Sequence, residues 1–325
     1  MRYVQLGKTD LIVSRICFGC WQLSPRFWGD VSMDDWRAAV RKAPEVGVNF
    51  IDTADAYGDG AAESALGDLL AEDKTRDSFI VATKFYHNFE KAERHPDTSY
   101  DYILRECEAS LKRLRTDRID LYQIHAWDPL TRPDEVAAAF GQLKKQGKVR
   151  WFGVSNLNAD QIRMYLRYCD IECLQPLYNM LAPEVEAREL PVCVENRMGV
   201  ISYSSLARGL LTGKYTPEAH FGDFRDDDPY FHGESYEAIK AGLDKLKPYC
   251  EKYRLTLPQF AVRWVLTHPA ITSAIIGVKK PDHIESIAPA ADGVLTNEDW
   301  HSASSIMATA GAAAKAARKK SSGTT

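Results

Sequence analysis

The sequence predicts a TIM barrel, a closed ring of eight parallel strands that alternate with helices. Two observations carry this prediction. Eight short apolar runs recur along the 325 residues, and amphipathic stretches with helical periodicity lie between them. No long linker splits the chain, so one barrel is favoured over the two ordinary domains that this length also allows.

The eight strand candidates are short runs rich in β-branched, aromatic and other apolar residues. In order, they are RICFG (15–19), VNFID (48–52), FIVATK (79–84), IDLYQIH (119–125), VRWFGVS (149–155), IECLQ (171–175), GVISYS (199–204) and ITSAIIG (271–277).

The helical patterns between these runs have apolar residues three and four positions apart. They cover residues 33–47, 63–73, 99–114, 133–147, 158–169 and 184–198, followed by a longer stretch from about 235 to 268. Thr98 or Ser99, and also Asn158, stand where helix N-caps are expected. Gly47 and Gly147 stand where helices are expected to end.

Three further segments lie outside this repeat. Residues 3–14, YVQLGKTDLIVS, place a GKTD turn between two short runs, which predicts a hairpin over the bottom of the barrel. Residues 215–234 are polar and turn-rich, which predicts a long loop over the top face. Residues 308–325 are low in complexity, which predicts a disordered tail after a barrel domain of residues 1–307.

Composition points to small-molecule chemistry. The net charge of -4, with both signs mixed, offers no electrostatic case for nucleic acid or an anionic membrane. No apolar stretch approaches the roughly 20 residues that span a bilayer, and MRYVQLGKTD is too polar for a signal peptide. We therefore expect a cytoplasmic protein, and nothing in the sequence indicates its oligomeric state.

Seven cysteines are scattered along the chain, and this odd number predicts reduced thiols rather than a disulfide framework. Cys17 and Cys20 form a CxxC pair. Because that pair lies in a predicted strand, where residues three apart face opposite sides, a redox or metal role is disfavoured.

Four polar residues lie at the ends of neighbouring predicted strands. Asp52 ends the second strand, with Tyr57 in the loop after it, Lys84 ends the third, and His125 ends the fourth. Catalytic groups of TIM barrels come from this end of the strands. Neighbouring strands are about 4.8 Å apart, so these side chains can converge. Burying Asp52 is costly without a partner, and Lys84 can be that partner.

This set suits proton donation to a carbonyl group. An ammonium beside Tyr57 favours its phenolate and would lower its pKa. Asp52 would keep Lys84 charged, and His125 would hydrogen-bond an incoming carbonyl oxygen.

Other interpretations of these residues remain open. Lys84 could form a Schiff base with a substrate carbonyl. A metal site at His125 is disfavoured, since no HxH or HExxH spacing accompanies it. Each of these side chains could also have a merely structural role.

Several motifs resemble those of the aldo-keto reductase family over about residues 1–290. They are GVNFIDTADAYG (47–58) with ESALG (63–67), SLKRLRTDRIDLYQIH (110–125), GKVRWFGVSNL (147–157), LQPLYNML (174–181), ISYSSLARGLLTGKY (201–215) and IIGVKKPDHIESI (275–287). The resemblance implies a TIM barrel and reversible, NAD(P)H-dependent reduction of aldehydes and ketones. It makes Asp52, Tyr57, Lys84 and His125 the catalytic tetrad, with Tyr57 as proton donor.

The resemblance also implies a cofactor site along the later strands. Nicotinamide contacts would come from Ser155, Asn156, Gln175 and Tyr203. Pyrophosphate contacts would come from Ser204, Leu206, Gly209, Leu210 and Lys214. The adenosine phosphate end would lie on Gly277, Val278, Lys279, Lys280 and His283. Because two adjacent lysines suit a 2′-phosphate, NADPH is expected in preference to NADH.

The substrate is expected to be a small carbonyl compound held by aromatic walls. The candidate walls are Trp21, Phe27, Trp28, Tyr86 and Trp127. Three positions depart from the family pattern near the adenine, where His283, Ser286 and Ile287 stand in place of Gln, Glu and Asn, which predicts fewer adenine hydrogen bonds. Because some proteins of this fold are channel-associated subunits, a nucleotide-binding regulatory protein with slow turnover is the alternative function.

Overall fold

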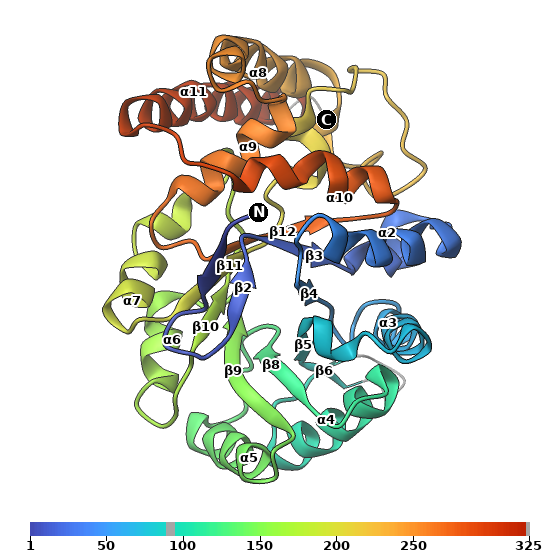
Figure 1. Cartoon of the computed structure of the whole chain (residues 1–325). Coiled ribbons are helices and arrows are strands. Elements are labelled where there is room, and N and C mark those ends of the chain that lie inside the picture. Colours follow the sequence, from blue (N-terminus) through green and yellow to red (C-terminus); the bar gives the residue numbers. More distant parts are fainter. Residues whose placement is uncertain (89–94, 323–325) are drawn as a thin grey trace.

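The computed structural model describes residues 1–88 and 95–322 and contains the predicted barrel (Figure 1). Eight parallel strands close into a ring in the order β3, β4, β5, β8, β9, β10, β11, β12. Their bounds are β3 (Ile16–Gly19), β4 (Phe50–Asp52), β5 (Ile80–Phe85), β8 (Ile119–Ile124), β9 (Val149–Ser155), β10 (Cys173–Gln175), β11 (Gly199–Ser202) and β12 (Ser273–Gly277). Each strand lies within one of the eight predicted runs or extends one residue beyond it, which confirms the predicted fold.

Helices surround the ring. They are α2 (Met33–Glu45), α3 (Ala61–Asp73), α4 (Tyr100–Leu114), α5 (Pro133–Lys145), α6 (Ala159–Tyr165), α7 (Glu189–Glu195), α8 (Gly233–Tyr253), α9 (Leu257–Thr267), α10 (Pro281–Ile287) and α11 (Asn297–Ser322), with a short α1 (Pro25–Trp28) after β3. The predicted cap at Asn158 is confirmed by a complete capping box with Gln161. Ser99 is the N-cap of α4 without a capping hydrogen bond from its side chain.

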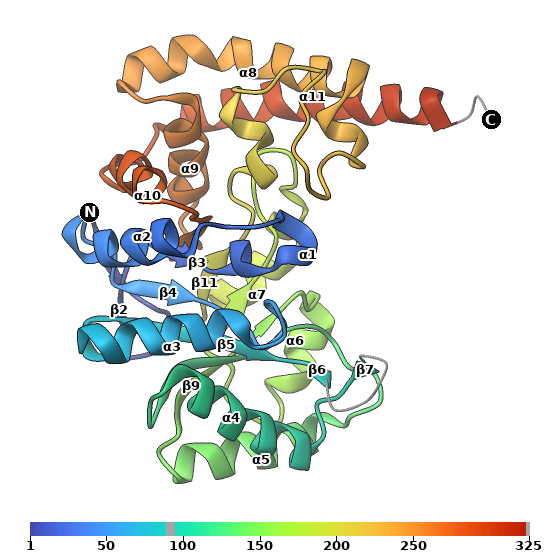
Figure 2. The same ribbon diagram turned by 90° about the vertical axis from the view of Figure 1, so that its right-hand side faces the viewer.

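The two ends of the barrel differ. Figure 2 shows the strands running toward the end that carries α1 and the ribbon of β6 (His87–Asn88) and β7 (His95–Pro96). The opposite end carries the N-terminal hairpin of β1 (Tyr3–Gln5) and β2 (Ile12–Ser14). The hairpin sends Leu6, Leu11 and Val13 into an apolar cluster with strand residues of the barrel interior. This confirms the predicted hairpin and closes the N-terminal end.

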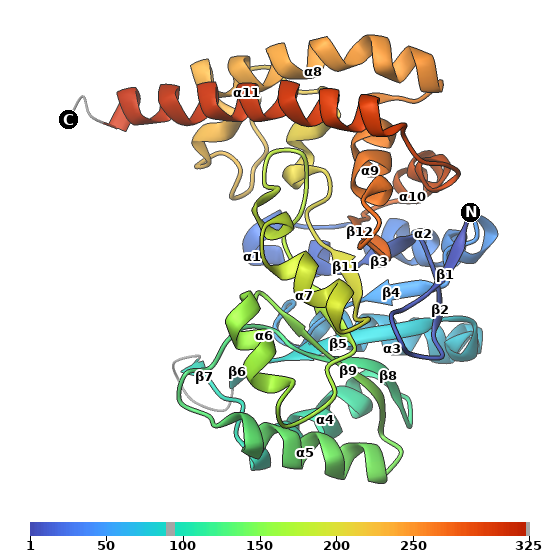
Figure 3. The same ribbon diagram turned by 90° about the vertical axis from the view of Figure 1, so that its left-hand side faces the viewer.

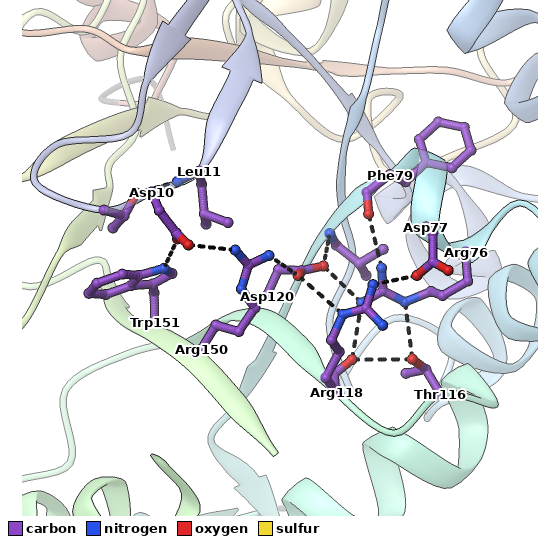
Figure 4. Close-up of polar contacts among 12 residues, drawn as sticks. Asp10, Leu11, Arg76, Asp77, Phe79, Thr116, Arg118, Asp120, Arg150 and Trp151 are labelled. Carbon is purple, nitrogen blue, oxygen red and sulfur yellow. Dashed lines mark hydrogen bonds and ion pairs between the residues drawn. The ribbon is translucent and has the colours of Figure 1, made fainter. Parts of the chain in front are cut away.

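A polar network built around Asp120 on β8 ties the bottom of the barrel together (Figure 4). The Asp120 side chain is buried. Its Oδ2 accepts hydrogen bonds from Arg76 Nη2 at 2.8 Å and from the backbone N–H of Val81 at 3.0 Å. Its Oδ1 accepts from Arg150 Nη1 at 2.8 Å. Three charge-assisted hydrogen bonds therefore satisfy one buried carboxylate.

The same network reaches the hairpin. Arg150 donates through its second terminal nitrogen to Asp10 Oδ2 at 3.0 Å, and Trp151 Nε1 donates to Asp10 Oδ1 at 2.7 Å. Asp10 lies in the hairpin turn and Arg150 on β9. The hairpin is thus fastened to the barrel both by apolar packing and by these exposed contacts.

We expect Asp120→Asn to lower the free energy of unfolding by about 3 kcal/mol, because it leaves Arg76 and Arg150 without a buried counter-charge. Asp10→Asn, at an exposed ion pair, should cost less than about 1 kcal/mol. Urea titration followed by tryptophan fluorescence measures both. Equal losses in the two variants would contradict a special role for the buried carboxylate.

The segment before α8 is largely irregular, as predicted for residues 215–234, and contains one turn of 3-10 helix (Pro229–Phe231). The backbone N–H of Phe224 donates to the carbonyl of Phe27, in α1, at 3.4 Å. This loop therefore lies against α1 at the C-terminal end of the barrel.

The prediction of disorder from residue 308 is wrong for residues 308–322. They continue helix α11 across the expected boundary at residue 307, and α11 lies along α8 in Figures 2 and 3. Alanine has the highest helix propensity, so a low-complexity alanine-rich run can be a helix. Ala310 approaches Gly242 of α8 so closely that a Cβ on that glycine would lie 2.6 Å from the Ala310 Cβ. Residues 323–325 lie outside the described residues.

All seven cysteines are free, as the sequence predicted. Among the described residues, no helix is long and apolar enough to cross a membrane.

Candidate active site

The four predicted catalytic residues meet at the C-terminal end of the barrel. Lys84 Nζ lies at the centre and donates hydrogen bonds to Asp52 Oδ1 at 2.6 Å, the Thr53 carbonyl at 2.8 Å and the Tyr57 hydroxyl at 3.1 Å. An ammonium has three N–H donors, so each one has a partner. The position and orientation of Lys84 are therefore fully specified.

Asp52 and Lys84 form a buried ion pair, with side-chain exposures of 2% and 0%. Burial is the largest influence on the pKa of Lys84 and acts to lower it, but Asp52 and Tyr57 outweigh burial and raise this pKa above its ordinary value. Lys84 is thus a stable cation at neutral pH. A Schiff-base role needs a neutral amine, so this environment disfavours it.

Tyr57 differs from the sequence prediction in the direction of its pKa shift. Its hydroxyl accepts a hydrogen bond from Lys84, which acts to lower the pKa as predicted, but burial outweighs that effect and raises the pKa to about 12. The sequence shows which charges are neighbours, whereas the degree of burial depends on the folded loop. Tyr57 is therefore a protonated phenol at neutral pH, with Lys84 placed to stabilise the phenolate that remains after proton transfer.

His125 lies beside Tyr57, with ring centroids 5.9 Å apart in an edge-to-face arrangement. Burial, followed by the charge of Lys84, lowers the pKa of His125 well below its ordinary value, so the imidazole is neutral. Its Nδ1 is buried and has no hydrogen-bond partner among the described residues. A neutral imidazole with free hydrogen-bonding capacity suits a polar substrate atom next to Tyr57.

A second group of polar side chains supports Asp52 from inside the barrel. Gln175 Nε2 donates to Asp52 Oδ2 at 2.8 Å, and Gln123 Nε2 lies 3.5 Å from the same oxygen. Gln175 was predicted only as a nicotinamide contact, and Gln123 was missed. Gln123 lies on β8, two residues before His125. Because side chains two apart on a strand face the same side, this spacing could have predicted that Gln123 points to the same side of the sheet as His125.

Three of the predicted nicotinamide contacts are linked to each other. Asn156 Nδ2 donates to the His125 carbonyl at 3.0 Å and lies 3.1 Å from Ser155 Oγ, and the Tyr203 hydroxyl donates to Asn156 Oδ1 at 2.8 Å. Asn156 has a left-handed backbone, with φ of 60°, a conformation that asparagine tolerates better than most residues. This linked group lies directly beside the tetrad.

The loop after β11 carries the predicted pyrophosphate contacts and has an unusual backbone. Left-handed φ values occur at Ser204, Ala207, Arg208 and Gly209, the last with φ of 104°. Left-handed residues in short loops form concave groups of backbone amides that bind anions, and strain of this kind gathers at functional sites. Leu206 is half-buried and Leu210 is buried below the loop, whereas Lys214 is exposed beyond it.

Cationic side chains gather at the end of β12. Gly277 is the last residue of β12 and Val278 follows it. Lys279 donates through its backbone N–H to His283 Nδ1 at 3.3 Å. Burial and the nearby charge of Arg225 lower the pKa of Lys279. The exposed Lys280 pairs with Asp282 at 3.4 Å. Arg225, from the loop before α8, was missed because that loop has no regular pattern.

The aromatic residues predicted as substrate walls fall into two groups. Trp21, Phe27 and Trp28 pack around Phe224 from the loop before α8, with Trp28 and Phe224 ring centroids 5.2 Å apart. Arg225 lies over the Trp28 ring at 5.1 Å, and the Lys279 ammonium lies over it at 5.4 Å. This group therefore adjoins the predicted adenosine end of the cofactor site.

Tyr86 and Trp127 form the second group, which follows β5 and β8 rather than β3. The Tyr86 hydroxyl donates to the Trp127 carbonyl at 3.2 Å. Both residues follow strands that end in the tetrad, β5 and β8. Their role as substrate walls stays a prediction.

The residues present fit a nicotinamide cofactor. Amide and hydroxyl groups adjoin the tetrad, a loop of left-handed backbone follows β11, and cations lie beyond β12. Within residues 1–88 and 95–322, no group of three or more histidine, cysteine or acidic side chains could hold a metal ion.

A parallel eight-stranded barrel with a buried aspartate–lysine pair, a tyrosine and a neutral histidine at its C-terminal end is a scaffold for carbonyl chemistry. The family model described as the Aldo/keto reductase family matches residues 15–308, and the chain belongs to this family. It is an NAD(P)H-dependent oxidoreductase.

Individual relatives support this assignment along nearly the whole chain. The aldo-keto reductase YhdN of Bacillus subtilis (strain 168) is 34% identical over 310 residues, covering 94% of each chain. The NADH-specific methylglyoxal reductase of Escherichia coli (strain K12) is 31% identical, covering 92% of this chain and 96% of that protein. The structure of glycerol dehydrogenase AKR11B4 from Gluconobacter oxydans superposes with a TM-score of 0.86 at 32% identity, covering 94% of this chain and 95% of the other.

Proposed function

We propose that this protein reduces small aldehydes and ketones to alcohols with NADPH, and that Tyr57 gives the proton. The observation that carries the proposal is Lys84, which joins Asp52 and Tyr57 through hydrogen bonds of 2.6 and 3.1 Å beside a neutral His125. No other group of described residues combines a proton donor, a fixed cation and a free hydrogen-bonding imidazole in this way.

NADPH, when bound, would supply the hydride that the carbonyl carbon accepts. His125 and the Tyr57 hydroxyl would hold the carbonyl oxygen, which takes the Tyr57 proton and becomes the hydroxyl of the alcohol. Lys84 stabilises the resulting phenolate by its hydrogen bond and charge, and Asp52 keeps Lys84 charged. Tyr57 then regains a proton from solvent.

We place Ser155, Asn156, Gln175 and Tyr203 at the nicotinamide, because Asn156 and Tyr203 are already joined beside His125. Ring stacking and amide contacts at these positions would select the ring face that delivers the hydride. The substrate would be a small-molecule carbonyl, and the seven free cysteines support a reducing, cytoplasmic location.

The test follows NADPH absorbance with purified protein and a panel of aldehydes that includes an aliphatic, an aromatic and a dicarbonyl compound. Consumption that requires both protein and aldehyde supports the proposal. If NADPH binds without being consumed by any carbonyl, reduction is rejected, and a nucleotide-binding regulatory role becomes the better account.

Cofactor choice is tested separately, because one relative is named NADH-specific. We expect Lys279→Ala with Lys280→Ala to weaken NADPH binding by about tenfold or more and to change NADH binding little, since each lysine can make a charge-assisted contact to the 2′-phosphate only. Isothermal titration measures both affinities. Lys247→Ala on α8, another exposed lysine that pairs with a neighbouring aspartate, is the control. Equal losses for the two cofactors would contradict the 2′-phosphate assignment.

A further inference from the structure

A second carboxylate, Asp128, lies three residues beyond His125 and is almost completely buried, at 1% exposure. It is not part of the tetrad, and its hydrogen bonds among the described residues go to Thr98, Leu130 and Thr131 instead. Asp128 stands in the HAWDP stretch of the loop after β8, and Trp127 is its neighbour. A buried carboxylate is costly unless it is fully hydrogen-bonded, so its partners show what it holds.

Asp128 accepts hydrogen bonds from two different loops. Within its own loop, Oδ1 accepts from the Leu130 N–H at 2.9 Å and Oδ2 accepts from the Thr131 hydroxyl at 2.8 Å. From the segment between β7 and α4, the backbone N–H and the hydroxyl of Thr98 both donate to Oδ2 at 3.1 Å. One carboxylate therefore joins the loop after β8 to the segment that leads into α4.

The joined segments carry the two aromatic residues beside the tetrad. The chain reaches Thr98 directly after Asp97, whose N–H donates to the Tyr86 carbonyl at 2.9 Å. The Tyr86 hydroxyl donates to the Trp127 carbonyl at 3.2 Å, which connects this segment to the loop after β8 a second time. Tyr86 and Trp127 are thus held at a defined separation by a closed circuit of hydrogen bonds, in which Asp97 takes part through its backbone N–H and Asp128 through its carboxylate.

This circuit adjoins the reacting centre. His87, next to Tyr86, has its ring centroid 6.0 Å from that of His125 and 4.9 Å from that of Tyr86. Trp127 packs edge-to-face on Tyr165 of α6, with centroids 5.8 Å apart. A change in the spacing of the two loops therefore alters the walls beside His125 without touching Lys84 or Tyr57.

We infer that Asp128 is a positioning residue for substrate selection: it fixes the separation of Tyr86 and Trp127 and thereby the fit of the carbonyl compound's side group. This inference rests on the proposed carbonyl reduction. Asp128 does not contact the reacting atoms, so its loss should affect KM for a substrate whose side group fills the space between the loops. It should leave kcat and cofactor binding nearly unchanged.

The test compares propanal, which has a small side group, with benzaldehyde, which has a large planar one. In Asp128→Ala, we expect KM for benzaldehyde to rise about tenfold, as for a side group that loses its fitted pocket. KM for propanal, kcat for both aldehydes and NADPH affinity should stay within about twofold. A fall in kcat that is equal for the two aldehydes, with KM unchanged, would indicate only a loss of folded protein and would overturn the inference.

A matched pair of threonine variants keeps the test decisive if Asp128→Ala folds poorly. Thr98→Val removes a hydroxyl that joins the two loops, and Thr131→Val removes one within a single loop, both from the same Asp128 oxygen. We expect Thr98→Val to raise KM for benzaldehyde about threefold and Thr131→Val to leave it unchanged, because only the first removes one of the two hydrogen bonds that join the loops. Equal effects of the two variants would overturn the inference.

Amide hydrogen exchange separates this inference from the proposed function. In Asp128→Ala, peptides covering residues 95–100 and 126–132 should both exchange faster than in the wild type, whereas a purely local role would affect only residues 126–132 and overturn the inference. If the wild-type protein reduces no carbonyl compound of the panel, the proposed function fails, and faster exchange in both peptides still supports Asp128 as the link between the loops.

Discussion

Tyr57→Phe is expected to lower kcat for carbonyl reduction by about a thousandfold, within the range that general acid catalysis contributes. The substitution removes one hydroxyl, the group that Lys84 Nζ contacts at 3.1 Å, and keeps the ring that packs against His125. The hydride donor and the cofactor contacts are untouched. NADPH affinity should therefore stay within about twofold, since the hydroxyl is the only group removed.

Steady-state kinetics and fluorescence titration of NADPH provide the two measurements. The matched control is Tyr122→Phe, which removes another buried tyrosine hydroxyl, on β8, that has no hydrogen-bond partner among the described residues. Activity that survives in Tyr57→Phe would reject Tyr57 as the proton donor. Activity lost equally in Tyr122→Phe would show that the assay reports folding rather than catalysis.

Lys84→Met is expected to abolish reduction and to destabilise the fold by about 3 to 5 kcal/mol, the cost of breaking a buried ion pair on one side. Methionine has a similar length but no charge. It leaves Asp52 at 2% exposure with only glutamine side chains as partners. The loss of stability comes from this uncompensated carboxylate rather than from the lost attraction alone.

The double variant Asp52→Asn with Lys84→Met distinguishes stability from catalysis. With both charges removed, chemical denaturation should show that most of the lost stability returns, while reduction stays absent because the ammonium that stabilises the Tyr57 phenolate is missing. Recovery of activity together with stability would mean that Lys84 acts in folding alone.

The fold and the convergence of the four polar residues were predictable from local patterns for a physical reason. Buried parallel strands appear in a sequence as short apolar runs, and polar side chains at their ends interrupt those runs, so Asp52, Lys84 and His125 are visible in the sequence itself. Their convergence then follows from the spacing of adjacent strands.

The parts that were not predictable depend on tertiary contacts. The raised pKa of Tyr57 reflects its burial in the folded protein, which the spacing of residues does not encode. Arg225 and Phe224 come from an irregular loop, and only the folded structure shows that both contact Trp28. The last part of α11 was misread because its alanine-rich composition is shared by disordered tails and by helices, and its packing on Gly242 decides between them.

The pairing of β3 with β12 has a consequence for how the protein is made. Ala274 lies opposite Ile16, and the Ala274 N–H donates to the Arg15 carbonyl at 2.9 Å. The first barrel strand therefore gains one of its two pairing partners only when the last strand has been synthesised. Until residues near 277 leave the ribosome, the growing sheet has two unpaired edges that invite association with other chains. Contacts of such long sequence separation also slow folding. Nascent chains of this enzyme should therefore depend on protection by chaperones until the final strand is synthesised.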